Sequence, residues 1–140
     1  MSDLQRFLDA QEPVFPAVLA ELRTGRKRTH WMWFVFPQLA GLGHSAMARF
    51  YAIANLKEAR RYLAHPVLGP RLEQCTGIVN AITDKTAHDI FGSPDDLKLR
   101  SSMTLFAAAA SDRAPFEAVL ARYFDAAPDP KTLDLLAASR

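Results

Sequence analysis

The sequence predicts an all-α fold: a single-domain compact bundle of about seven to nine short helices that spans residues 1–140. First, apolar residues recur at the three- and four-residue spacing of helices, and the alternation typical of half-buried strands is scarce. Second, proline, glycine and capping residues interrupt the chain at short intervals. Third, 49% of residues are hydrophobic and 23% are charged, and a chain of this length buries roughly two thirds of its unfolded surface.

The first two helices are expected before residue 25. Residues 4–8 place three apolar side chains on one short helical face. Pro13 and Pro16 then begin a second helix, whose apolar residues between positions 15 and 22 follow the i, i+3, i+4, i+7 rule. Gly25 is expected to end this helix, because glycine readily adopts the left-handed conformation found at helix C-termini.

Residues 31–36, with the sequence WMWFVF, form the most apolar segment of the chain. Thr29 is expected to cap a short helix here, and Pro37 to limit it, because proline disfavours helical geometry at the residue before it. A buried strand is the competing interpretation of this segment. Residues 37–43 contain two glycines and are expected to form a loop.

Capping residues also mark the middle of the chain. Ser45 is expected to cap a helix that continues to Tyr51. Asn55 starts another helix, and the break before Pro66 ends it. Residues 66–82 then resume a helical spacing of apolar side chains.

The clearest helix start lies at Ser93 and Pro94. A hydroxyl stands at the expected cap, proline follows at the first helical position, and Asp95 and Asp96 occupy the first turn, where the helix dipole favours carboxylates. This helix is expected to run to about Ala110. Three other helices are expected at residues 86–91, which Gly92 closes, at 115–124, and at 130–138, which Asp129 caps.

The charge of the chain is unevenly distributed. The formal net charge is +2, but residues 22–72 hold nine basic residues and one acidic residue, a net charge of +8, and each flank carries −3. A fold that gathers this segment on one side would create a positive surface that attracts anions. A solvated basic surface without a partner is the simpler alternative. The basic residues are Arg23, Arg26, Lys27, Arg28, Arg49, Lys57, Arg60, Arg61 and Arg71.

Residues 26–36, with the sequence RKRTHWMWFVF, combine basic and aromatic side chains. Basic groups beside exposed aromatic rings are a common means of holding phosphates while a base is stacked. In this interpretation Arg28, His30 and Trp31 contact the ligand. The alternative is that the aromatic side chains belong to the core, most clearly at positions 34–36.

A second set of polar side chains lies on the helix expected after Ser93. Asp95, Lys98 and Ser102 stand at i, i+3 and i+7, so they share one helical face. If this face borders a cleft, it is suited to binding an anion or, less favourably, to a lysine-activated serine nucleophile. The alternative is an ordinary ion pair, with hydroxyl groups bonded back to the preceding turn.

Several classes of protein are not supported by the sequence. The four histidines lack the spacing of metal ligands, and Cys75 is the only cysteine, so we expect no metal and no cofactor. The segment 31–36 is far shorter than the ~20 apolar residues of a membrane-spanning helix, so we expect no membrane contact. The charged start of the chain and the lone thiol favour a cytoplasmic location.

Nine segments carry a family resemblance. They are residues 30–39 (HWMWFVFPQL), 41–43 (GLG), 51–53 (YAI), 58–59 (EA), 62–63 (YL), 65–69 (HPVLG), 71–72 (RL), 91–98 (FGSPDDLK) and 100–106 (RSSMTLF). With these motifs the chain resembles domain-of-unknown-function family 1810, whose proteins are sometimes mislabelled calpastatin, from about residue 8 to residue 136. The resemblance implies an all-α domain and assigns no activity.

The resemblance also implies a set of recurring polar positions. In this chain they are Arg28, His30, Trp31, Gln38, Gly43, Ser45, Tyr51, His65, Arg71, Asp95, Lys98, Ser101 and Ser102. So many defined polar groups suggest a site rather than packing alone. The ligand-binding residues expected on this basis are Arg28, His30, Trp31, Gln38, Arg71, Asp95, Lys98 and Ser102.

The functional hypothesis is therefore a pocket that binds or processes an anionic, nucleotide-like small molecule. A more distant similarity, a lysine a few residues before a methionine and an aromatic residue on a late helix, connects the chain with helical ADP-ribose-processing glycosidases. If the protein is an enzyme, ADP-ribose-type glycosidic chemistry is the reaction that this similarity implies. The alternative is a non-catalytic module that binds nucleic acid through its basic surface or another protein through exposed aromatic side chains.

Overall fold

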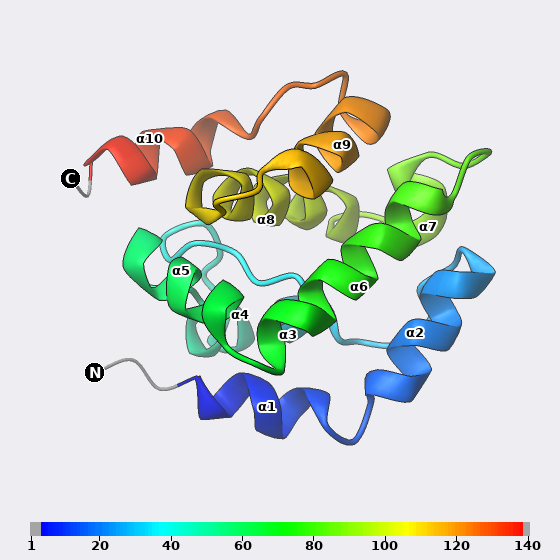
Figure 1. Cartoon of the computed structure of the whole chain (residues 1–140), viewed down its shortest axis with the longest axis horizontal. Helices are drawn as coiled ribbons and strands as arrows, with labels where there is room; N and C mark the ends of the chain where they lie inside the picture. Colours follow the sequence, from blue (N-terminus) through cyan, green and yellow to red (C-terminus); the bar gives the residue numbers. More distant parts are fainter. Residues whose placement is uncertain (1–3, 139–140) are drawn as a thin grey trace.

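Ten α-helices follow one another within residues 4–138, the part of the chain that the computed structural model describes (Figure 1). The all-α prediction is confirmed, and the helix count is slightly above the expected seven to nine; three of the ten helices, all in segments expected to be helical, have only four or five residues. The helices are α1 (Gln5–Gln11), α2 (Phe15–Thr24), α3 (Met32–Val35), α4 (Ala46–Phe50), α5 (Leu56–Ala64), α6 (Leu68–Ala81), α7 (Ala87–Phe91), α8 (Asp95–Ala109), α9 (Ala114–Tyr123) and α10 (Pro130–Ala138).

Residues 31–36 are not a strand, and no membrane-spanning helix is found within residues 4–138. Residues 31–36 contain the helix α3, so the strand interpretation of this segment is wrong. An isolated parallel bridge joins Leu39 to Ile53, and it ties the loop of residues 37–43 to the chain after α4. Within residues 4–138, no helix has the length and apolar character needed to span a bilayer.

Three helices start as the capping pattern predicts. Ser45 Oγ accepts a hydrogen bond from Ala48 N at 3.1 Å, and Asn55 Oδ1 accepts one from Glu58 N at 2.9 Å. Asp129 Oδ2 accepts one from Thr132 N at 3.0 Å at the start of α10. A capping box that was not predicted forms at Thr86, at the start of α7. These side chains satisfy amide donors that the first turn of a helix leaves without intrahelical partners.

Two predicted caps are wrong. Thr29 does not cap α3, because its hydroxyl donates to Glu21 Oε2 at 2.7 Å and Trp31 precedes the helix. Ser93 does not cap α8, because helical geometry starts at the residue after Pro94, one position later than expected, and Pro94 takes the cap position without a side-chain hydrogen bond. The two carboxylates expected in the first turn of α8 are there.

The long helix α8 lies at the centre of the molecule. It packs against α5, α7, α9 and α10, and Figure 1 shows it between α1 along one edge and α9 and α10 along the other. The buried side chains of α8 belong to one continuous apolar core. The largest fully buried side chains of this core are Trp31, Tyr62, Phe7, Phe36, Phe106 and Phe116.

A buried polar side chain connects four helices. Gln11 Nε2, on α1, donates to Phe34 O on α3 at 2.7 Å and to Tyr62 Oη on α5 at 3.0 Å. Arg71 Nη1, on α6, donates to Gln11 Oε1 at 3.4 Å. Burial raises the pKa of Tyr62 far above its ordinary value, so its hydroxyl stays protonated. The network therefore fixes how these helices meet, because a buried polar group must keep its partners.

Candidate ligand-binding site

Glu21 organises the connection between α2 and α3. Gly25 ends α2 with a left-handed conformation (φ 77°), and the chain then returns toward the helix it has just left. The Glu21 carboxylate accepts hydrogen bonds from Arg28 N at 2.6 Å, from Thr29 N at 3.0 Å and from Thr29 Oγ1 at 2.7 Å. Trp31 Nε1 donates a further bond at 3.0 Å. One carboxylate thus holds the backbone and the first aromatic side chain of the basic segment.

These hydrogen bonds also set the ionisation of Glu21. Burial raises the pKa of this carboxyl group, but the bonds from Thr29, from the Arg28 amide and from the Trp31 indole outweigh burial and lower the pKa from 4.5 to about 2. Hydrogen bonds to the charged form of a carboxyl group stabilise that form. Glu21 is therefore ionised at neutral pH.

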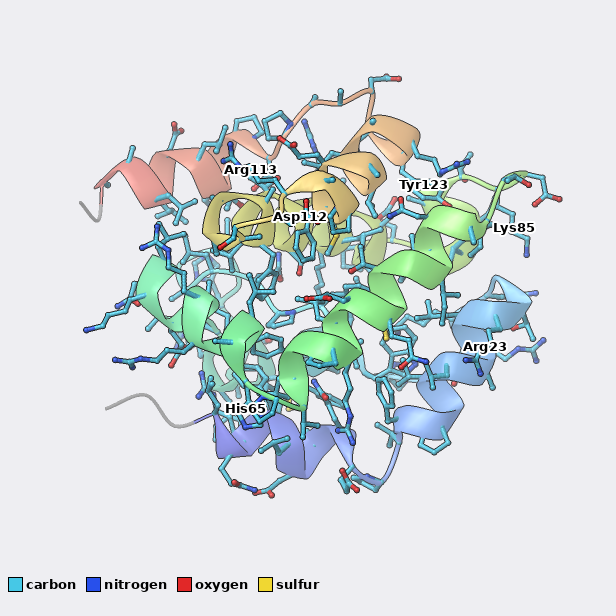
Figure 2. All side chains as sticks on the ribbon, in the orientation of Figure 1. Arg23, His65, Lys85, Asp112, Arg113 and Tyr123 are labelled. Atoms are coloured by element: carbon cyan, nitrogen blue, oxygen red, sulfur yellow. The ribbon has the colours of Figure 1, made fainter. Side chains whose placement is uncertain are left out.

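The basic segment is also tied to α7 and to the chain that precedes it. Lys27 N donates to Ile90 O at 2.7 Å, and Lys85 Nζ donates to Gly25 O at 3.0 Å. Figure 2 shows Lys85 and Arg23 toward the same end of the molecule, where Lys85, in the segment before α7, reaches the end of α2. Two separate parts of the chain therefore fix the segment that enters the candidate site.

Two lysines share one carboxylate at the start of α8. Lys27 Nζ lies 2.9 Å from Asp95 Oδ2, and Lys98 Nζ lies 3.4 Å from Asp95 Oδ1. The Lys27 side chain is 6% exposed and that of Lys98 is 22% exposed. The group carries one more positive than negative charge, and water reaches it only in part. We call Lys27, Asp95 and Lys98, with Trp31 and Trp33, the Asp95 cluster.

Each lysine of the Asp95 cluster also lies over a tryptophan ring. Lys27 Nζ is 5.1 Å from the centroid of Trp31, and Lys98 Nζ is 5.0 Å from the centroid of Trp33. Ammonium groups at this distance are attracted by the negative face of the indole. Trp31 is 1% exposed and belongs to the core, whereas Trp33 is partly exposed. Trp33 is therefore the tryptophan that a ligand can reach.

Ser102 lies on the same face of α8 as Asp95 and Lys98, one turn beyond the lysine. Its side chain is fully buried, and its Oγ has no hydrogen-bond partner within residues 4–138. The lysine-to-serine hydrogen bond of an activated nucleophile is accordingly absent from this part of the chain. Ser101 and Thr104 instead donate to the carbonyls four residues earlier, at 3.2 and 2.8 Å, as expected for helix hydroxyls.

Arg71 has its partners at the corner between α1 and α2. Its Nη2 lies 2.9 Å from Glu12 Oε2, and its guanidinium lies 4.7 Å from the centroid of Phe15. The same guanidinium donates to Gln11, in the buried network described above. The structure thus gives Arg71 a set of contacts separate from those of the Asp95 cluster.

Three more of the expected site residues lie outside the Asp95 cluster. The side chains of Arg28 and His30 are exposed on the segment that Glu21 organises. Gln38 lies in the loop of residues 37–43, where it lines a small pocket of about 180 Å³ together with Arg49. Of the eight residues expected from the sequence, the structure therefore joins Asp95 and Lys98 directly, and it places Trp31 beneath Lys27, which pairs with the same carboxylate.

The basic residues of positions 22–72 do not form one continuous surface. Arg23 lies on α2, whereas Lys57, Arg60 and Arg61 lie on α5. Figure 1 shows α2 and α5 toward opposite ends of the longest axis of the molecule. The charge excess seen along the sequence is thus divided between separate regions.

Glu21, Lys27 and Trp33 are absent from the set of site residues expected from the sequence. Lys27 and Trp33 lie in the basic and aromatic segment, but a pattern of residue types does not say which lysine reaches Asp95. Glu21 carries no sequence signal, because its partners are backbone amides that only the folded loop brings together. Within residues 4–138, no group of three or more histidine, cysteine, aspartate or glutamate side chains is arranged to hold a metal ion.

Comparisons with known proteins agree with the helical architecture. The sequence model described as "Protein of unknown function (DUF1810)" matches residues 1–136. The crystal structure of the conserved hypothetical protein Rv1873 from Mycobacterium tuberculosis is similar, with 56% sequence identity, 96% coverage of each chain and a TM-score of 0.95. No curated protein matches the chain. The chain therefore belongs to the family of proteins of unknown function DUF1810.

Proposed function

We propose that the Asp95 cluster binds an anionic, nucleotide-like small molecule. In this proposal the phosphate groups lie against Lys98 and Lys27, with Arg28 at the margin, and the base stacks on Trp33. The observation that carries the proposal is that two lysines share the single carboxylate of Asp95.

The charge balance of the cluster favours an anionic partner. Within residues 4–138, Asp95 is the only carboxylate paired with either lysine, and both lysine side chains are mostly screened from water. Charges that are partly removed from water interact more strongly than exposed ones, so an additional anion would be stabilised here. A phosphate group supplies that anion and accepts several hydrogen bonds from ammonium donors.

The aromatic half of the cluster favours a ligand with a planar ring. Trp33 is partly exposed, and the Lys98 ammonium lies over its face. Stacking of a base on an aromatic side chain contributes about 1–3 kcal/mol. A nucleotide would use both parts of the cluster at once, since its phosphate draws Lys98 aside and its base covers the ring.

Binding is proposed here in preference to catalysis. Within residues 4–138, Ser102 Oγ has no hydrogen-bond partner, and no base activates it. Glycosidic processing of ADP-ribose-type molecules has only the distant family similarity in its favour. ADP-ribose is therefore used below as a test ligand, and its hydrolysis would extend the proposal.

The two alternative functions have less support. Nucleic-acid binding through one basic surface is disfavoured, because the basic residues on α2 and α5 lie toward opposite ends of the molecule (Figure 1). A protein-interaction surface around the tryptophans is disfavoured because Trp31 is buried. A small anionic molecule remains the partner that fits the contacts of the Asp95 cluster.

The proposal is tested by measuring thermal protection and tryptophan fluorescence with ADP-ribose, AMP, ATP and inorganic phosphate. We expect at least one nucleotide to raise the melting temperature and quench Trp33, and Lys98→Ala to weaken its binding by tenfold or more. Lys57→Ala is the matched control, because Lys57 is an exposed lysine on α5. A panel without any protection, or equal losses in the two variants, would overturn the proposal.

A further inference from the structure

A second cavity lies between α8, α9 and α10 and includes no residue of the Asp95 cluster. Its volume is about 440 Å³, within the range of small-molecule sites. Its walls are mainly aliphatic, and no aromatic side chain lines it. The apolar residues that line it include Ala107, Ala108, Leu120, Ala121, Ala126 and Leu133. Such a wall fits an alkyl group better than a planar ring.

Two charged side chains lie at the edge of this cavity. Arg113, where α9 begins (Figure 2), donates its Nε hydrogen to Ala107 O at 2.9 Å, which fixes the orientation of the guanidinium. The terminal nitrogens of Arg113 and the carboxylate of Glu117 have no partner within residues 4–138, although both residues line the cavity, Arg113 at the position that precedes α9 and Glu117 in the first turn of that helix. A donor and an acceptor are thus presented together to the cavity.

The loop between α9 and α10 forms one wall of the cavity, and its backbone is strained. Asp125 (φ 55°) and Ala126 (φ 61°) both adopt the left-handed conformation, which side chains other than glycine take at an energetic cost. Ala126 lines the cavity directly. Strained backbone of this kind is often found where a loop shapes a ligand site.

Hydrogen bonds from α8 hold this loop in place. Arg100 donates from Nε to Ala127 O and from Nη2 to Pro128 O, both at 3.0 Å. Thr104 Oγ1 accepts a bond from Asp129 N at 2.8 Å. The wall of the cavity is therefore fixed by three hydrogen bonds before any ligand arrives, which lowers the entropic cost of binding.

We propose that this cavity binds a small aliphatic molecule whose uncharged head group both donates and accepts hydrogen bonds, as a primary carboxamide does. The alkyl chain lies among the alanine and leucine side chains. The carboxamide oxygen accepts from Arg113, and its NH₂ group donates to Glu117. A carboxylate head would be attracted by Arg113 but repelled by Glu117, and an ammonium head would be attracted by Glu117 but repelled by Arg113. Neither charged head therefore gains a net charge interaction that offsets the loss of its hydration, whereas the uncharged carboxamide keeps a hydrogen-bond partner on both sides.

The test is a titration of the ¹⁵N-labelled full chain, followed by amide chemical shifts, with octanamide, octanoate and octylammonium below their aggregation concentrations. We expect octanamide to shift the amides of Ala107, Ala121, Ala126 and Leu133 in a saturable manner. We also expect octanamide to bind at least fivefold more tightly than either charged analogue. Saturable shifts that lie elsewhere, or no shifts with octanamide, would overturn the site.

Two matched variants locate the binding. Ala121→Leu places a larger side chain in the cavity, and we expect it to weaken octanamide binding by tenfold or more. Ala118→Leu is the same change on the same helix. Ala118 is exposed, as Ala121 is, and both line the neighbouring hollow, but Ala118 does not line the cavity, so we expect its change to have no effect. The dispersion of the amide spectrum verifies that each variant is folded. Equal affinity of all three probes would overturn the head-group assignment.

Discussion

The Trp31 indole donates its Nε1 hydrogen to the Glu21 carboxylate at 3.0 Å, and both side chains are largely buried. The same carboxylate holds the backbone amides of Arg28 and Thr29. A residue of α2 therefore determines how the basic segment approaches α8. The arrangement of the Asp95 cluster depends on this contact, because Lys27 lies between Gly25 and the amides that Glu21 holds.

The first prediction concerns Glu21→Gln. The amide keeps the size of the side chain but has only one acceptor oxygen, so at least one charge-assisted bond is lost. We expect the free energy of unfolding to fall by about 1–3 kcal/mol. Urea denaturation followed by circular dichroism measures the loss. Glu117→Gln, at an exposed position without a partner within residues 4–138, is the control and should change stability by no more than about 0.5 kcal/mol.

The second prediction concerns pH. The pKa of Glu21 is lowered from 4.5 to about 2 in the folded protein, so its ionised form contributes stability that is fully present above pH 4.5. This stability is lost as the pH falls from about 4.5 to 2, because the unfolded chain then binds a proton more readily than the folded one. Melting temperatures of the wild type and Glu21→Gln should therefore converge across this interval. A difference that stays constant would contradict the assignment.

The third prediction concerns Asp95→Asn. This change removes the carboxylate that Lys27 and Lys98 share, and leaves two ammonium groups close together. We expect the free energy of unfolding to fall by about 1–3 kcal/mol, and inorganic phosphate to restore part of it. Thermal melts with and without phosphate at constant ionic strength measure both effects. Asp134→Asn, at an exposed position on α10, should show neither response.

The fourth prediction concerns Ala126→Gly. The left-handed conformation of Ala126 costs roughly 1–2 kcal/mol, and glycine avoids this cost but gains freedom in the unfolded chain. We expect a net stabilisation of about 0.5–1 kcal/mol. Ala118→Gly, in the exposed interior of α9, should destabilise by about 0.5–1 kcal/mol. Chemical denaturation measures whether each change raises or lowers the free energy of unfolding. A destabilised Ala126→Gly protein would show that the loop is not strained.

The fifth prediction concerns Cys75, which is fully buried on α6. Burial raises the pKa of its thiol from 9.0 to about 12, so the reactive thiolate is scarce at pH 8. We expect Ellman's reagent to leave the native protein unmodified over an hour and to label one thiol after unfolding in guanidinium. Rapid labelling of the native chain would show that α6 opens readily.

Local patterns predicted most of the helices, because a cap or a glycine acts on residues within one turn of itself. Asn55 and Ser45 cap their helices as expected, and Gly25 ends α2 in the left-handed conformation. Thr29 and Ser93 are residues of the types that commonly cap helices, but neither caps a helix here. Thr29 is drawn to a carboxylate on another helix, and at Ser93 the first helical turn begins one residue too late.

The candidate site was predicted less completely. The i, i+3 spacing of Asp95 and Lys98 indicated their ion pair, which the structure contains. It did not indicate that Lys27, almost seventy positions earlier, approaches the same carboxylate from the other side. Nor did the spacing indicate that Arg71 lies outside the Asp95 cluster, where the structure pairs it with Glu12 instead. A long, flexible basic side chain has many acidic partners in the sequence, and the fold selects one.

The sequence by itself determined the helical class, most helix boundaries and the apolar character of residues 34–36, because these depend on spacing and on backbone preferences within a few residues. Only the tertiary structure decided that Trp31 is buried against Glu21 while Trp33 remains accessible, and that Lys27 and Lys98 meet at Asp95. The physical reason is that burial and ion pairing depend on distances between helices. Those distances follow from how the whole core packs, and no short segment of the chain contains that information.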